Sequence, residues 1–163
     1  AYYDSIESLP LEDEVSINEV CQTMIAEFIQ RRKDDVKIKF NTNINNNVTA
    51  KTYYSALYKM LKYTLDNADK FTSRGTIDIE CSKIKEKTII SFTDTGCGIS
   101  KENQDLVFNR FFRTESQYHG VGLGLPICVR IASLINARIY LDKSYENGCR
   151  FIIELSDNHK SHS

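Results

Sequence analysis

The segment TIISFTDTGCGIS, residues 88–100, carries the clearest structural pattern in the chain. Its first half alternates apolar and polar residues as a half-buried β-strand does, and the alternation stops at the glycine-containing turn DTGCGIS (94–100). Directly upstream, TIDIECSKI (76–84) alternates in the same way, and the polar residues KEK (85–87) separate the two stretches. The pattern therefore predicts two antiparallel strands joined by a short turn and followed by a glycine-rich loop.

Before this hairpin, the apolar spacing predicts two helices and one strand. The first helix is expected to be capped by Asn18 and to end near Lys33. Its buried face is predicted to consist of Val20, Met24, Ile25, Phe28 and Ile29. VKIKF (36–40) then alternates as a strand does, and the turn-rich NTNINNN (41–47) follows. The second helix is expected over residues 52–71, and its buried stripe is predicted to be Leu57, Met60, Leu61, Leu65 and Ala68.

After the glycine-rich loop, a short helix is expected near residues 101–107 and a longer one over residues 122–136. ARIYLDKS (137–144) and GCRFIIEL (148–155) then predict a closing hairpin. Helices interspersed with antiparallel hairpins indicate an α/β fold of the two-layer α+β sandwich type. We expect one mixed, largely antiparallel sheet that three helices cover on one face.

Length and composition indicate a single domain with no charge bias. The 163 residues carry a formal net charge of -1, so neither a nucleic-acid partner nor direct contact with a membrane surface is expected. Five scattered cysteines without a CxxC pair predict structural thiols in a reducing cytoplasm. Residues 1–14 are expected to be a linker from an absent upstream domain, residues 15–156 the domain itself, and residues 157–163 a polar tail.

The end of the second predicted helix, LDNADKFT (65–72), places three side chains on one helical face: Asn67, Lys70 and Phe71. Such a face is often no more than a solvated helix end beside a core aromatic residue. Alternatively, the amide oxygen of Asn67 can ligate Mg²⁺, Lys70 can neutralise phosphate charge, and Phe71 can pack on a base or ribose.

Two glycine-rich segments have the same two interpretations. In DTGCGIS, Asp94 follows a strand and can accept a hydrogen bond from an exocyclic amine such as that of adenine, or the segment is simply a bend. GVGLGLPI (120–127) leads into a helix, where backbone N–H groups can bind phosphate, or it is a flexible hinge. It lacks the GKS or GKT of a P-loop. VFNRFFR (107–113) is either an amphipathic turn or the hinge of a lid whose arginine reaches a terminal phosphate.

In this order and spacing, the four segments resemble the catalytic and ATP-binding domain of sensor histidine kinases. These domains have the Bergerat fold of the GHKL superfamily, which also includes type II topoisomerases, heat-shock chaperones and mismatch-repair proteins. LDNADKFT looks like the N box, DTGCGIS and GVGLGLPI like the two glycine boxes, and VFNRFFR like the F box. The resemblance covers roughly residues 16–155.

The resemblance implies Mg·ATP as the bound nucleotide. Asn67 would ligate Mg²⁺ and Arg113 would approach the γ-phosphate, and these two form the expected catalytic pair. The expected nucleotide-binding set is Asn67, Lys70, Phe71, Asp94, Gly96, Gly98, Ile99, Phe108, Arg113, Gly120, Gly122, Leu123, Gly124 and Leu125. Within it, Asp94 would bind the adenine amine, while the glycines from Gly120 onward would wrap the phosphates.

The chain departs from the kinase pattern at Tyr63, one helical turn before Asn67, where a second asparagine usually stands. The hydrolysing branches have a glutamate there, and a neutral phenol is a poor base by comparison. Two alternatives therefore stay open: a pseudokinase or nucleotide-sensing interaction module, and a serine kinase of the anti-sigma-factor type.

None of the three histidines stands in a phosphoacceptor motif. The acceptor is therefore expected on the dimerisation helices of a longer parent protein, which would pass the phosphoryl group to a response regulator. This domain is expected in the cytoplasm, and if the parent is membrane-bound, its anchor lies outside this chain.

Overall fold

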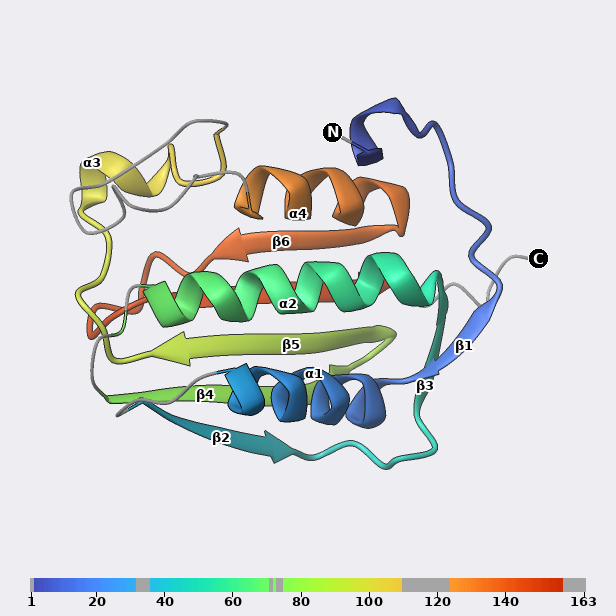
Figure 1. The fold of residues 1–163 in the computed structure, drawn as a ribbon, viewed down its shortest axis with the longest axis horizontal. Coiled ribbons are helices and arrows are strands. Elements are labelled where there is room, and N and C mark those ends of the chain that lie inside the picture. Colours follow the sequence, from blue (N-terminus) through green and yellow to red (C-terminus); the bar gives the residue numbers. More distant parts are fainter. Residues whose placement is uncertain (1, 32–35, 71, 73–74, 110–123, 157–163) are drawn as a thin grey trace.

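The structure is a computed structural model that describes residues 2–31, 36–70, 72, 75–109 and 124–156. Its centre is a five-stranded sheet in the order β2 (Val36–Thr42), β4 (Gly75–Ile84), β5 (Lys87–Asp94), β7 (Arg150–Ser156) and β6 (Ala137–Leu141). β2 pairs with β4 in parallel, and the other neighbours are antiparallel. The prediction of a mixed, largely antiparallel sheet is confirmed, as are both hairpins (Figure 1).

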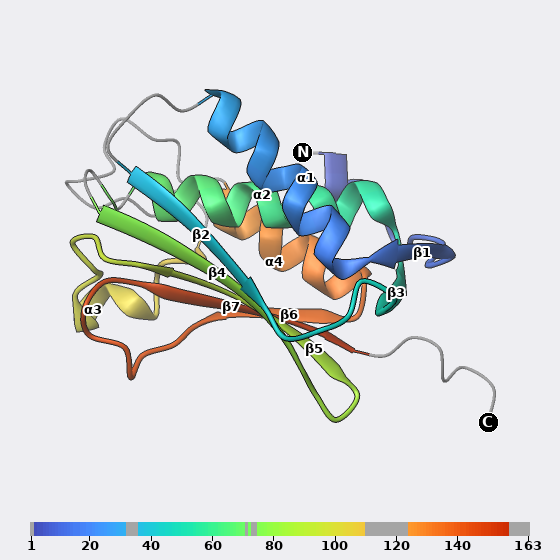
Figure 2. The same ribbon diagram turned by 90° about the horizontal axis from the view of Figure 1, so that it is seen from below.

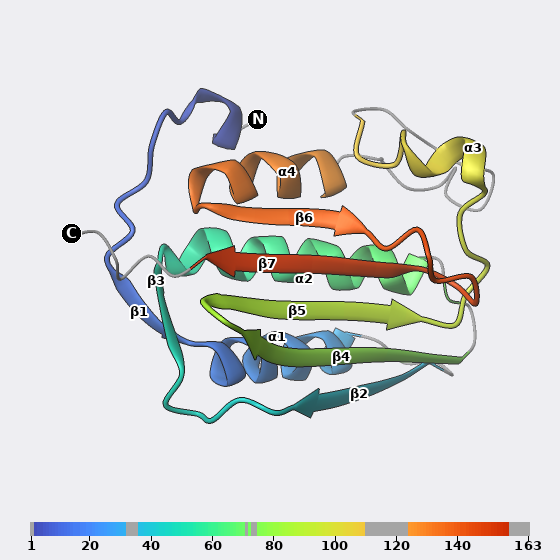
Figure 3. The ribbon, with the colours of Figure 1, turned by 180° about the vertical axis from the view of Figure 1, so that it is seen from behind.

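Three helices cover one face of this sheet: α1 (Ile17–Arg31), α2 (Tyr54–Lys70) and α4 (Gly124–Leu134) (Figure 2). From the opposite side the strands lie in front of the helices, so the domain has two layers (Figure 3). The short helix α3 (Lys101–Gln104) lies beside this sandwich, and it is shorter than the predicted 101–107. Within the described residues, no helix is both long and apolar enough to span a bilayer.

The core lies between the two layers because period-2 strands and period-3.6 helices direct their apolar side chains toward each other. Its fully buried members include Ile77, Ile79, Ile90 and Phe92 from the central strands. The predicted stripe of α2 is confirmed, since Leu57, Met60, Leu61, Leu65 and Ala68 are all buried. This packing fixes the end of α2 against the ends of β4 and β5, where the candidate site lies.

Two predictions for the first helix are wrong. Ile29 is 54% exposed: Ile25 already lies at the edge of the buried face, and one turn rotates the next position by about 40° toward solvent. Asn18 does not cap the helix but lies inside it with a buried side chain. Its Nδ2 donates to Ile44 O at 2.9 Å, which ties down the following loop. The Ser16 hydroxyl accepts from Glu19 N at 3.4 Å and takes the capping position instead.

The sequence did not reveal a second, two-stranded sheet, in which β1 (Asp13–Ser16) pairs antiparallel with β3 (Thr49–Thr52). Asp13 also caps α2 by accepting from Tyr54 N at 2.8 Å. Upstream, Tyr2–Ser5 form a 3₁₀ helix, η1, in which Tyr3 is buried. Arg130 of α4 donates from Nε to Tyr3 O at 3.0 Å. These first residues therefore pack on the domain, while their role as a linker from another domain stays a prediction.

Candidate functional site

Asp94 ends β5 and is fully buried. Its Oδ1 accepts hydrogen bonds from Gly96 N at 2.9 Å and from Cys149 N at 3.2 Å. Its Oδ2 is buried and has no hydrogen-bond partner among the described residues, and the same is true of Thr72 Oγ1. A buried carboxylate oxygen normally has a donor, because desolvation without one is costly. These two unsatisfied atoms therefore indicate a place where a ligand with its own polar edge belongs.

Electrostatics lead to the same conclusion. Burial raises the pKa of Asp94, and it outweighs the lowering by hydrogen bonds from Gly96 and Cys149. The Thr72 hydroxyl lies near enough to the carboxylate to lower the pKa as well, although within the described part of the chain neither Thr72 Oγ1 nor Asp94 Oδ2 completes a hydrogen bond. A raised carboxyl pKa means that these hydrogen bonds do not make up for the hydration that the ionised form loses on burial. A ligand that donates to Oδ2 would add a further hydrogen bond to the ionised form.

The turn after Asp94 brings backbone close to backbone. Gly98 has φ +73°, which favours glycine, and a Cβ there would lie 3.4 Å from Gly148 O. Gly148 has φ +147°, and a Cβ there would lie 2.0 Å from Asp94 O, which is impossible without movement. Ile99 follows with its side chain buried. The strand end, the glycine turn and the β6–β7 loop therefore form one packed unit around the carboxylate.

A second group of residues lies where the end of α2 meets the start of α4. Asn67 is 7% exposed, and its Nδ2 donates to Tyr63 O at 2.9 Å, so Oδ1 is the amide atom available to a metal ion. A Cβ on Gly124, the first residue of α4, would lie 3.0 Å from Asn67 Nδ2. The positive end of the α4 dipole therefore lies beside the side-chain amide of Asn67, which suits a phosphate group accompanied by a metal ion.

The family model described as "Histidine kinase-, DNA gyrase B-, and HSP90-like ATPase" matches residues 52–159. This chain belongs to that family. The predicted recognition and fold class are thereby confirmed for a histidine-kinase-type ATPase domain.

Relatives and solved structures agree with this assignment. The chain is 31% identical over 158 residues to the histidine protein kinase SaeS of Staphylococcus epidermidis, covering 91% of this chain and 44% of SaeS. It is 31% identical over 170 residues to a sensor-like histidine kinase, ycf26, of Pyropia yezoensis, covering 93% of this chain and 26% of that protein. It thus spans less than half of these curated relatives.

Among solved structures, the catalytic domain of histidine kinase ThkA in a nucleotide-free form superimposes with a TM-score of 0.79 and 26% identity. The match covers 89% of this chain and 95% of that domain. The likeness therefore extends over nearly the whole of a known catalytic domain.

In this ATPase domain, Tyr63 packs at the junction of α2 and α4. A Cβ on Gly124 would lie 3.7 Å from Tyr63 Cβ, and Lys62 Nζ lies 5.5 Å from the centroid of the Tyr63 ring. Burial raises the pKa of Tyr3, and neighbouring phenols that include Tyr63 raise it further. The Tyr63 ring is thus held by residues of the domain itself, half-buried against the core.

The structure brings several of the predicted residues together. Gly96 donates to the Asp94 carboxylate, and Gly98 and Ile99 follow in the same turn. Asn67 and Gly124 meet where the two helices approach each other, and Lys70 ends α2 one turn after Asn67. Leu125 is buried in the core at the first turn of α4, and Phe108 packs edge-on against Phe151, with ring centroids 6.0 Å apart. Five predicted residues lie outside the described part of the chain: Phe71, Arg113, Gly120, Gly122 and Leu123.

Sequence reasoning missed the residues that hold Asp94 from the β6–β7 loop, namely Tyr145, Gly148 and Cys149. The alternation in residues 137–144 and 148–155 predicted the hairpin correctly. It carried no information that the hairpin would pack against a strand end more than fifty residues earlier in the chain.

Proposed function

We propose that this chain is the ATP-binding, catalytic domain of a sensor histidine kinase. It binds Mg·ATP and presents the γ-phosphoryl group to a histidine on a separate dimerisation domain. The observation that carries the proposal is a pair of buried polar atoms that have no hydrogen-bond partner among the described residues: Asp94 Oδ2 at the end of β5 and Thr72 Oγ1 just after α2. Membership of the ATPase family and the likeness to kinase catalytic domains support it.

The donor and acceptor pattern at this pair suits adenine. Asp94 Oδ2 can only accept when ionised, and Thr72 Oγ1 can donate or accept. Adenine presents an exocyclic amine as a donor, whereas guanine presents a carbonyl oxygen at the same place. A carboxylate facing that oxygen would leave two acceptors opposed, so the site should reject guanine. Ile99 and Phe71 would supply apolar contact to the base.

The phosphates would lie toward the start of α4. Gly124 and the preceding Gly120, Gly122 and Leu123 would supply backbone N–H groups, and Lys70 and Arg113 would supply charge. Asn67 would hold Mg²⁺ through Oδ1, since Mg²⁺ prefers oxygen donors and completes its shell with phosphate oxygens and water. When bound, the metal ion neutralises phosphate charge.

Catalysis would rest on positioning and electrostatics, as phosphoryl transfer generally does. The acceptor histidine nitrogen forms a bond to the γ-phosphorus, the bond to the bridging oxygen breaks, and ADP leaves. Arg113 would stabilise the charge on the transferred group. Passage of the phosphoryl group to a response-regulator aspartate would require other parts of the parent protein. We place this domain in the cytoplasm.

Tyr63 bears on the alternatives. A neutral phenol replaces the glutamate that activates water in hydrolysing relatives, so rapid ATP hydrolysis is not expected. A pseudokinase would bind nucleotide without transferring the phosphoryl group, or bind none, and the transfer assay below separates it from a kinase. The comparisons give no support to that alternative or to the serine-kinase alternative.

A transfer assay tests the proposal. The chain is incubated with γ-labelled ATP, Mg²⁺ and a separately produced dimerisation domain from a related kinase, alongside a copy whose acceptor histidine is replaced by glutamine. We expect acid-labile label on the intact acceptor alone. Acid-stable label would indicate a serine or threonine kinase. Nucleotide binding without transfer to this acceptor or to the parent's own dimerisation domain would indicate a nucleotide sensor.

A further inference from the structure

The loop that joins β6 to β7 contacts Asp94 at four points, the first of them the backbone hydrogen bond that Asp94 N donates to Cys149 O at 2.8 Å. Cys149 N donates to Oδ1 at 3.2 Å, and the Tyr145 hydroxyl donates to the Asp94 carbonyl oxygen at 3.3 Å. Gly148 passes against the same carbonyl oxygen so closely that no Cβ fits there. The position of this loop therefore sets where the Asp94 carboxylate stands.

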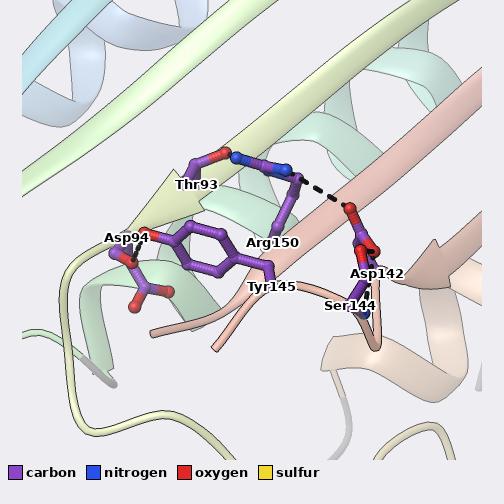
Figure 4. A network of polar contacts seen from close by, with 6 residues as sticks. All are labelled: Thr93, Asp94, Asp142, Ser144, Tyr145 and Arg150. Atoms are coloured by element: carbon purple, nitrogen blue, oxygen red, sulfur yellow. Dashed lines mark hydrogen bonds and ion pairs between the residues drawn. The ribbon is translucent and has the colours of Figure 1, made fainter. Parts of the chain in front are cut away.

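Arg150, the first residue of β7, fixes that loop through three contacts that Figure 4 shows together. Its Nε donates to Thr93 Oγ1 at 3.0 Å, and its Nη1 lies 3.3 Å from Asp142 Oδ2. Its guanidinium carbon lies 4.4 Å from the centroid of the Tyr145 ring. One planar cation thus links the residue before Asp94, the start of the loop and the tyrosine whose hydroxyl reaches Asp94.

Asp142 completes the loop from its other end. Its Oδ1 accepts from the Ser144 hydroxyl at 2.6 Å and from Ser144 N at 3.0 Å, while Asp142 N donates to Arg150 O at 2.8 Å. The hydrogen bond from the Ser144 hydroxyl lowers the pKa of Asp142, and Arg150 lowers it further. The carboxylate is therefore ionised at neutral pH and pairs with the guanidinium.

The role of this network in folding is small, because the side chains of Arg150 and Asp142 are 36% and 23% exposed, and partly exposed ion pairs contribute little to stability. A side chain that recognises a ligand through a hydrogen bond, by contrast, must be held to within about 0.5 Å of its binding position. We infer that Arg150 and Tyr145 are positioning residues for Asp94, and that they set the preference of the site for a base with an exocyclic amine. This inference rests on the proposed ATP site.

The test compares two nucleotides by calorimetric titration of the whole 163-residue chain. One is a non-hydrolysable ATP analogue, and the other is purine riboside triphosphate with the same modified phosphate chain, which differs from the first only in having no exocyclic amine. The variants are Arg150→Met, which keeps the aliphatic stem, and Tyr145→Phe, which keeps the ring beside the guanidinium. Thermal melting accompanies each titration.

The structure offers a matched control in Arg138→Met. Arg138 also pairs with a carboxylate, Glu154 at 3.5 Å, and also stacks on a tyrosine, Tyr140 at 4.9 Å. It stands on the same pair of strands, where Glu154 lies opposite Ile89 of β5. Ile89 stands five residues before Asp94 on β5, a distance of roughly 16 Å along the strand.

We expect Arg150→Met to weaken binding of the ATP analogue about tenfold and Tyr145→Phe about threefold, as loss of a hydrogen bond would. Binding of purine riboside triphosphate should change by less than about twofold in both, because that ligand does not use the carboxylate. Arg138→Met should leave both affinities unchanged. In an Asp94→Asn background, Arg150→Met should have no further effect on either nucleotide.

The other outcomes separate the two proposals. Equal loss of affinity for both nucleotides, or no loss in either variant, would overturn the positioning role while leaving the ATP site in place. If Arg150→Met does not fold, Tyr145→Phe decides in the same way. If the unsubstituted chain binds neither nucleotide, the ATP site itself fails, and the positioning role fails with it.

Discussion

Replacing Asp94 with asparagine should separate nucleotide binding from stability. Asp94 Oδ1 accepts two backbone N–H groups, so the asparagine oxygen must stay there to keep both bonds. Its –NH₂ group then takes the place of Oδ2 and faces the adenine amine, donor against donor. Turning the amide around would place that –NH₂ group against the N–H groups of Gly96 and Cys149, which is no better.

The magnitude follows from the hydrogen bond that is lost. A hydrogen bond to a charged acceptor contributes about 1.5–3 kcal/mol, so the Kd for an ATP analogue should rise roughly ten- to 150-fold. Stability should move the other way. The folded-state pKa of Asp94 is raised, so its contribution favours folding at low pH and is lost as pH rises through that pKa. At neutral pH the ionised group destabilises the free domain, and asparagine removes that cost.

The assay is calorimetric titration together with thermal melting, and Asp66→Asn is the control. Asp66 is a carboxylate on α2 that pairs with Arg31 and Lys62, both at 3.7 Å, and takes no part in the site. Asp94→Asn should keep or raise the melting temperature and lose affinity, while Asp66→Asn should keep its affinity. If Asp94→Asn binds ATP as tightly as the unsubstituted chain, the adenine site has been placed wrongly.

Four further predictions concern other parts of the site. Asn67→Ala should reduce the gain in affinity on adding Mg²⁺ by roughly tenfold but leave Mg²⁺-free binding nearly intact, as titrations with and without EDTA would show. Gly148→Ala, whose Cβ would lie 2.0 Å from Asp94 O at φ +147°, should cost roughly 2 kcal/mol or more by urea unfolding and abolish binding. Tyr63→Asn should lower stability by about 1–2 kcal/mol, because a half-buried ring is lost, while ATP affinity holds or improves; a large loss of affinity would contradict this. As pH falls, ATP affinity should decline as Asp94 gains its proton, with a midpoint above the usual aspartate range that is missing in Asp94→Asn.

Much of the fold could be predicted because its signals are local. The period of apolar residues predicted α2 together with its buried stripe, and it predicted the β4–β5 hairpin; both predictions were confirmed. The failures have a common cause. Asn18 has the residue type of a helix cap, but a long-range contact with Ile44 decides its role. β1 and β3 are too short for periodicity to show, and only their pairing makes them strands.

The candidate site likewise contains residues that could be predicted from the sequence and residues that could not. Asp94 and Asn67 could be named because they stand in segments whose order resembles a known family. Tyr145 and Arg150 could not, because nothing near them in the sequence indicates that they pack around a carboxylate on another strand. The consequence of Tyr63 could not be predicted either, since it depends on which side of α2 meets Gly124.

The central claim is that this domain binds Mg·ATP between the Asp94 carboxylate and the junction of α2 and α4. The most direct test is calorimetric titration of the chain with a non-hydrolysable ATP analogue, with and without Mg²⁺, alongside the matching GTP analogue. We predict saturable binding of the ATP analogue that tightens with Mg²⁺, and much weaker binding of the GTP analogue. No binding up to millimolar ATP analogue, or equal binding of both analogues, would contradict the account.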